Sequence, residues 1–161
     1  DRIQKGELFS EENYLTDSAF KRATAYHTAK SRKVFSGGGI MPDVFVPADT
    51  SGNTRLIQEL GEAQLFNAYV IDKMQPVLNG FKADSSFLKN YNVNNDQFDD
   101  FIGYASKTLK EMDSKEVKVS KDNIKLLLKA YAARYKWGDT AYFQVLNSDD
   151  STLRRAVAEI N

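Results

Sequence analysis

The 161-residue chain contains no cysteine and only one histidine, His27. The lack of cysteine excludes disulfide bonds and cysteine-ligated zinc sites, and it leaves the redox compartment undefined. A conventional Ser-His-Asp triad would have to use His27 as its base. The composition therefore removes several common kinds of catalytic and metal site.

An excess of charge of one sign is also lacking, because 22 Lys and Arg residues balance 22 Asp and Glu residues. This balance argues against a nucleic acid or an anionic membrane as a partner held by net charge. No apolar run approaches the roughly 20 residues that a membrane-spanning helix needs. The chain starts at Asp1 without a signal-peptide pattern, and we expect it to be a piece of a longer protein.

Hydrophobic periodicity changes near residue 50. Residues 1–50 are irregular, with two short predicted strands, Val34-Phe35 and Val44–Val46, on either side of a glycine run. Residues 51–161 repeat apolar side chains every three or four positions, which is typical of amphipathic helices. We predict a mainly α fold: a helical domain of about four to six helices over 51–161, preceded by an irregular segment with two short strands around a Gly-rich turn.

One long helix is predicted at the start of this domain. Ser51 or Asn53 is its expected cap, and Pro76 is expected to end or kink it. Its apolar stripe consists of Leu56, Leu60, Ala63, Phe66, Val70, Met74 and Val77.

Capping residues delimit the later helices, which are predicted over about 85–91, 95–112, 121–137, 139–146 and 148–161. Their expected boundary residues are Asp84, Asn94 or Asn95, Ser120 and Gly138. The alternation EVKV at 116–119 fits a short strand as well. In the last helix, Leu153, Val157 and Ile160 are expected to face inward.

No residue pattern in the chain indicates catalysis, a cofactor or a metal. His27 lies in a polar stretch, and no serine lies in a G-x-S-x-G turn. Only an all-oxygen metal site is compatible with the composition. The pairs Asp99-Asp100 and Asp149-Asp150 lie at predicted helix starts, where the helix dipole favours carboxylates. We therefore predict no catalytic, cofactor-binding or metal-binding residues.

The segment KAYAARYKW at 129–137 mixes basic and aromatic side chains, a pattern also found where bases stack over a phosphate-binding surface. On a helix, Tyr131 and Tyr135 fall on the predicted buried stripe, whereas Lys129, Arg134 and Lys136 fall on other faces. We therefore favour a core helix with a solvated basic side over a nucleic-acid site.

The stretch RKVFSGGGIMPDVFVPADT at 32–50 is the most distinctive motif. Successive amides of Gly37–Gly39 can form an anion nest, but the spacing fits neither a phosphate loop nor a dinucleotide fingerprint. Glycines followed by Pro42 and a short β-branched run indicate a tight reversal of the backbone.

This stretch resembles the segment that follows the catalytic core in carboxyl-terminal processing peptidases, the tail-specific serine proteases, in the form found in Bacteroidetes. Ser31 stands where the family has glycine. The upstream KGELFSEENY also resembles that group, and the helical tail resembles its C-terminal extension more loosely. The matching residues are Arg32, Val34, Phe35, Gly37, Gly38, Gly39, Ile40, Pro42, Asp43, Val46, Pro47, Asp49 and Thr50.

The resemblance implies a serine endopeptidase of the periplasm or cell envelope that cleaves proteins near their C-terminus with a Ser-Lys dyad, often with a PDZ domain. The dyad normally precedes the glycine motif, so no serine or lysine of this chain is assigned to it. Residues 1–50 would then be the end of the protease core, and 51–161 a helical extension. The extension would brace the core, gate substrate or support oligomerisation.

The partners implied are the parent's core and PDZ domain, its protein or peptide substrates, and a second copy in a homodimer through residues 30–47. Two other hypotheses remain open. One is a stand-alone helical adaptor for protein interactions, and the other is a small anion-binding domain that uses Gly37–Gly39.

Overall fold

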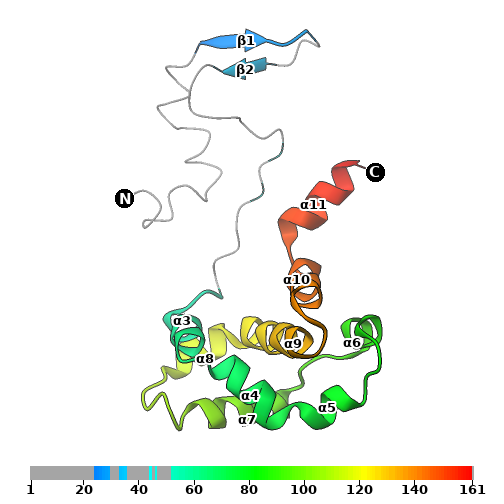
Figure 1. Cartoon of the computed structure of the whole chain (residues 1–161). Coiled ribbons are helices and arrows are strands. Elements are labelled where there is room, and N and C mark those ends of the chain that lie inside the picture. Colours follow the sequence, from blue (N-terminus) through cyan, green and yellow to red (C-terminus); the bar gives the residue numbers. More distant parts are fainter. Residues whose placement is uncertain (1–23, 30–32, 36–43, 45, 47–51, 161) are drawn as a thin grey trace. The chain divides into compact units, whose positions relative to one another are not determined.

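The structure, a computed structural model, describes residues 24–29, 33–35, 44, 46 and 52–160 (Figure 1). The described part is mainly helical, which confirms the predicted fold class. Two compact units divide the chain: one consists of residues 1–48 and 151–161, and the other of residues 49–150.

A two-stranded antiparallel sheet is formed by β1 (Ala25–His27) and β2 (Lys33–Phe35). Tyr26 lies opposite Val34 in this ladder. The predicted strand at 34–35 is confirmed, but the one at 44–46 is wrong, because neither Val44 nor Val46 lies in a strand. The partner of β2 precedes it in the chain, and residues 28–32 join the two strands, a connection of ordinary hairpin length.

The last helix, α11 (Ser151–Ile160), belongs to the same unit as the hairpin. Its side chains Leu153, Val157 and Ile160 are 41%, 51% and 85% exposed. The expectation that they face inward is therefore wrong. Their spacing gives the helix an apolar stripe, but spacing alone does not determine which unit a helix joins.

Eight helices make up the described part of the unit 49–150. They are α3 (Arg55–Glu62), α4 (Leu65–Lys73), α5 (Gln75–Asn79), α6 (Asp84–Asn90), α7 (Asn95–Ala105), α8 (Ser114–Val119), α9 (Lys121–Trp137) and α10 (Asp139–Ser148). Figure 1 shows α3 and α8 at one end of this unit, α5 and α6 at the other, and α9 running between the two ends.

The described helices outnumber the predicted four to six mainly because the long helix expected first is broken into α3, α4 and α5. Gln64 separates the first two with a φ of 55°, a left-handed conformation that costs a non-glycine residue free energy. Hydrogen bonds from its backbone N and its side-chain Nε2 to the Gly61 carbonyl hold this conformation. Pro76 lies in the first turn of α5, where its missing N–H costs nothing.

Among the predicted caps of α3, α6 and α7, only that of α7 agrees with the structure. The N-cap position of α3 is Thr54 rather than Asn53, and the Thr54 side chain makes no capping hydrogen bond; Ser51 lies outside the described residues. Of the two predicted caps of α7, Asn94 and Asn95, the structure has Asn94, which forms a capping box with Gln97. Asp84 is the first residue of α6 rather than its cap.

The later boundaries follow the predictions except in three places. The first is at the last two helices, because α10 extends to Ser148 and α11 begins at Ser151, against the predicted 146 and 148. α9 begins after Ser120 and ends at Gly138, whose φ of 84° suits glycine. α7 ends at Ala105, short of the predicted 112. The EVKV alternation forms helix α8, not a strand, because Asp113 caps its first turn by accepting a hydrogen bond from the Lys115 N–H.

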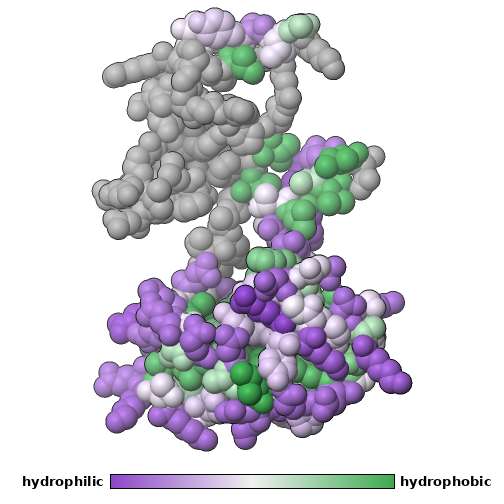
Figure 2. Space-filling model, in the orientation of Figure 1, coloured by the Kyte–Doolittle hydropathy of each residue, from purple (hydrophilic) through white to green (hydrophobic). Residues whose placement is uncertain are grey.

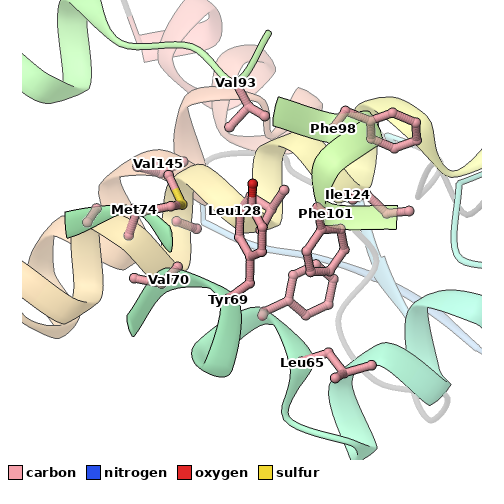
Figure 3. Close-up of a cluster of buried hydrophobic side chains, with 14 of the residues drawn as sticks. Leu65, Tyr69, Val70, Met74, Val93, Phe98, Phe101, Ile124, Leu128 and Val145 are labelled. Atoms are coloured by element: carbon pink, nitrogen blue, oxygen red, sulfur yellow. The ribbon is translucent and has the colours of Figure 1, made fainter. Parts of the chain in front are cut away.

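The hydrophobic core of this unit surrounds α9. Its most buried helical face includes Ile124, Leu128 and Ala132, all 0% exposed. Phe66 stacks between Phe101 and Tyr131, with ring centroids 5.2 and 5.3 Å away. Figure 3 shows side chains of α4, α7 and α9 converging in this core. Each large side chain buried here contributes about 1.5–3 kcal/mol. Most of the first predicted stripe is buried, but Ala63 is exposed, so its assignment to the core is wrong.

Candidate functional site

His27, the chain's only histidine, is an exposed residue of β1 and lies opposite Lys33 in the hairpin. A catalytic histidine is normally oriented by a carboxylate. Here the directly paired residue is a cation, so the cross-strand position supplies no such group.

The glycine motif lies almost entirely outside the described residues. Gly37–Gly39, Ile40 and Pro42 are among these undescribed positions, so both the anion nest and the tight reversal stay predictions. Within the motif's second half, Val44 is exposed and Val46 is half-buried.

The two acidic pairs were expected at helix starts, but neither pair lies in the first turn of a described helix. Asp99 and Asp100 lie inside α7, where Asp100 Oδ2 accepts a 2.9 Å hydrogen bond from the Tyr69 hydroxyl. Asp149 and Asp150 lie between α10 and α11. Asp100 thus joins two helices, and Asp149 and Asp150 belong to a connecting segment. The sequence pattern reveals neither placement.

No group of three or more His, Cys, Asp or Glu residues able to hold a metal occurs among the residues that the structure describes. Within the same residues, no helix is both long and apolar enough to cross a membrane.

Two basic residues of 129–137 hold neighbouring helix ends, a role that is not among the predictions from the sequence. Lys136 Nζ donates 2.6 Å hydrogen bonds to the backbone carbonyls of Leu78 and Phe81. Lys129 Nζ donates to the Leu88 carbonyl at 2.8 Å. Both ammonium groups therefore contact carbonyls at or just beyond the C-terminal ends of α5 and α6, where the Leu78 carbonyl also accepts the Phe81 N–H. The signal in the sequence is that Lys129 and Lys136 are seven residues, or two helical turns, apart and therefore lie on one face of α9.

The aromatic residues of the same segment divide between core and surface. Tyr131 stacks on Phe66 and meets the Tyr142 ring edge-on, with centroids 5.5 Å apart. Tyr135, predicted to be buried, is 52% exposed. Arg134 forms a 2.7 Å ion pair with Asp139 and lies over the Tyr142 ring. These contacts support the structural interpretation of the segment over a base-stacking surface.

The point where the chain enters the helical unit lies close to α9 at Gly52 and is held by two hydrogen bonds, one to Ser120 and one to Glu116 of α8. A Cβ atom at Gly52 would lie 2.2 Å from Asn123 Nδ2, so only glycine fits there without displacing that side chain. Thr54 Oγ1 lies 2.6 Å from the hydroxyl of Ser120, a fully buried polar residue. Glu116 Oε2 accepts a 3.1 Å hydrogen bond from the Leu56 N–H, at the start of α3.

Beside these contacts lies a polar cleft of about 580 Å³, lined in part by Arg55, Glu59, Lys110, Asp113 and Glu116. Most of these groups already have partners. Arg55 pairs with Glu59 at 2.6 Å, and Glu59 raises the pKa of Arg55. Asp113 and Glu116 accept from backbone N–H groups. The cleft therefore contains capping groups rather than a set of converging catalytic side chains. Figure 2 shows a mostly hydrophilic surface on one face of this helical unit.

Comparison with known proteins gives one match. No curated protein and no solved structure matches the chain. A family model matches residues 56–138, more than half of the chain, from the start of α3 to the glycine that ends α9. The match therefore covers α3 to α9 but not α10, whose Ala141 and Val145 also lie in the core. The chain belongs to this family, described as a family of unknown function (DUF8443).

Proposed function

We propose that this chain is the non-catalytic C-terminal portion of a tail-specific serine peptidase of the cell envelope, and that its helical unit braces the catalytic core. The resemblance of residues 32–50, with GGGIMPD at their centre, carries this proposal. The parent enzyme would cleave proteins near their C-terminus with a Ser-Lys dyad that lies outside this chain.

Bracing is favoured over a loosely tethered role by the way in which the chain enters the helical unit. The motif ends at Thr50, and the contacts of Gly52, Thr54 and Leu56 with α8 and α9 begin immediately afterwards. A chain held at two nearby residues, here Thr54 and Leu56, transmits force better than a flexible linker does. The helical unit also has its own aromatic core, so it can act as a rigid support.

The simplest test of the peptidase assignment uses the chain itself and the gene from which it comes. We expect the purified chain not to cleave a peptide that carries a C-terminal degradation tag. We also expect the coding sequence upstream of Asp1 to specify a Ser-Lys peptidase core. Turnover by the chain alone, or an unrelated domain upstream, would contradict the assignment.

The bracing role is tested in the full-length enzyme. Deleting residues 51–161 should lower its thermal stability and its activity together. Glu116→Gln, which weakens the cap on α3, should lower both slightly, whereas the exposed Lys118→Met on α8 should change neither. Unchanged stability and activity after the deletion would exclude bracing and gating together, and a change in oligomeric state alone would assign the extension to assembly.

A stand-alone helical adaptor remains the second candidate, and exposed aromatic side chains favour it. Tyr135 and Phe143 are 52% and 56% exposed, and such residues are enriched at protein interfaces. An adaptor would show a start codon or an unrelated domain upstream, together with a binding partner that is lost on Phe143→Ser substitution.

A further inference from the structure

A second cleft, of about 290 Å³, lies within the helical unit and is separate from the polar cleft beside α3. Lys125 and Lys129, one turn apart on α9, both line it. Asn92 and Val93 from the connection between α6 and α7, together with Ser148 at the end of α10, contribute to its walls. We propose that this cleft binds a carboxylate group, held between the ammonium groups of Lys125 and Lys129.

The two ammonium groups contact neutral oxygens. Lys125 Nζ donates to Asn95 Oδ1 at 2.7 Å. Lys129 Nζ donates to the Leu88 carbonyl at 2.8 Å and to Asn92 Oδ1 at 3.3 Å. No ion pair of Lys125 or Lys129 is found among the described residues. Like charges one turn apart on a helix repel each other, so an anion between them removes an unfavourable interaction.

Partial burial makes this positive charge harder to solvate. It lowers the pKa of the Lys129 ammonium group, as expected for a cation that is partly withdrawn from water. An ammonium group has three N–H donors, and two of those of Lys129 are used by the Leu88 and Asn92 oxygens. The third donor can serve a ligand.

The remaining lining residues determine the type of anion. Asp122 and Asp149 also line the cleft, and their negative charges disfavour a dianion such as phosphate. Val93 and Leu126 supply apolar walls. A singly charged carboxylate attached to an apolar group fits this combination best, whether it comes from a small acid or from the end of a peptide.

The test is an NMR titration of the full chain at constant ionic strength with acetate, with N-acetyl-leucine and with N-acetyl-leucine amide. We expect both carboxylates to shift the amide signals of Val93, Leu126 and Lys129, and the uncharged amide to leave them unchanged. Tighter binding of N-acetyl-leucine than of acetate would indicate a peptide end as ligand, and equal binding a small acid. Equal shifts with the uncharged amide would overturn the proposal.

Substitutions localise the binding. Lys125→Met should weaken acetate binding about tenfold, the effect of losing one charged hydrogen bond, and Lys129→Met should do the same if it folds. Asp122→Asn should strengthen binding, and Lys118→Met on α8 is the matched control that should leave it unchanged. The site is wrong if Lys125→Met and Lys118→Met have the same effect. It is equally wrong if inorganic phosphate at pH 7.5 binds more tightly than acetate.

Discussion

The hydroxyl of Tyr69 on α4 donates a 2.9 Å hydrogen bond to Oδ2 of Asp100 on α7. A second hydrogen bond joins the same two helices in the opposite direction: the Tyr104 hydroxyl of α7 donates to Asp72 Oδ2 of α4 at 2.7 Å. The two tyrosine rings meet edge-on, with centroids 5.4 Å apart. Each helix thus supplies one donor and one acceptor, which fixes the register between α4 and α7.

Tyr69→Phe should lower the free energy of unfolding by about 1–2 kcal/mol, since the ring stays but Asp100 loses a partner. Chemical denaturation followed by circular dichroism measures this. Tyr135→Phe, at an exposed tyrosine of α9, is the matched control and should have almost no effect. Equal stability of the two variants would show that the hydroxyl of Tyr69 contributes nothing.

The protein should lose stability in alkaline solution. Burial, followed by the hydrogen bond to Asp100, raises the pKa of Tyr69, and burial also raises the pKa values of Tyr91 and Tyr142. A raised pKa in the folded state means that stability is intact below the unfolded tyrosine pKa of about 10 and falls as the pH rises above it. Thermal melts between pH 8 and 11 test this, and Tyr69→Phe should reduce the slope. A flat profile would contradict the expectation.

The buried contact between Thr54 and Ser120 should show energetic coupling. Ser120→Ala leaves the Thr54 hydroxyl without its partner and should cost about 1 kcal/mol. Thr54→Val should cost a similar amount, and the double variant less than the sum of the two. Thr54→Ser keeps the hydroxyl and serves as the control. Strict additivity in the double-mutant cycle would rule out a direct contribution of this hydrogen bond.

Lys136→Met should destabilise the protein by about 1 kcal/mol or more, because two carbonyls near the C-terminal end of α5 lose a charged donor. Hydrogen exchange should show the loss of protection concentrated in residues 75–92. Lys118→Met is the control, since that exposed lysine of α8 makes no such contact. Uniform loss of protection across the helical unit would refute this local capping role.

Asn94→Ala should remove the side-chain acceptor of the α7 capping box and cost about 1 kcal/mol. Asn94→Asp should retain most of the stability, because a carboxylate also accepts the Gln97 N–H bond and suits the positive end of the helix dipole. Urea denaturation of the three proteins makes the comparison. A deficit in Asn94→Asp as large as in Asn94→Ala would argue against the cap.

Local signals predicted the elements whose boundaries are set by their own residues. Asn94 with Gln97 specifies the start of α7, and Gly138 specifies the end of α9, because capping and left-handed conformations depend on nearby backbone atoms. The break at Gln64 was not predicted. The apolar stripe continues across Gln64, so the side-chain pattern gives no sign that one residue there has a left-handed backbone conformation.

The site features that were missed all join residues far apart in the sequence. Lys136 reaches Leu78, and Glu116 reaches the Leu56 N–H, contacts that exist only after the helices have packed. The buried Ser120 was expected as an ordinary cap, whereas its hydroxyl contacts Thr54.

Composition, periodicity and local hydrogen bonding are enough to show that the chain is mainly helical, where several helices begin and end, and that cysteine chemistry is excluded. Which polar groups meet follows from the packing of the helices instead. The packing places Lys125 and Lys129 in one cleft and Tyr69 on Asp100. Such pairings depend on how the helices pack, and packing is a property of the whole core rather than of any one segment.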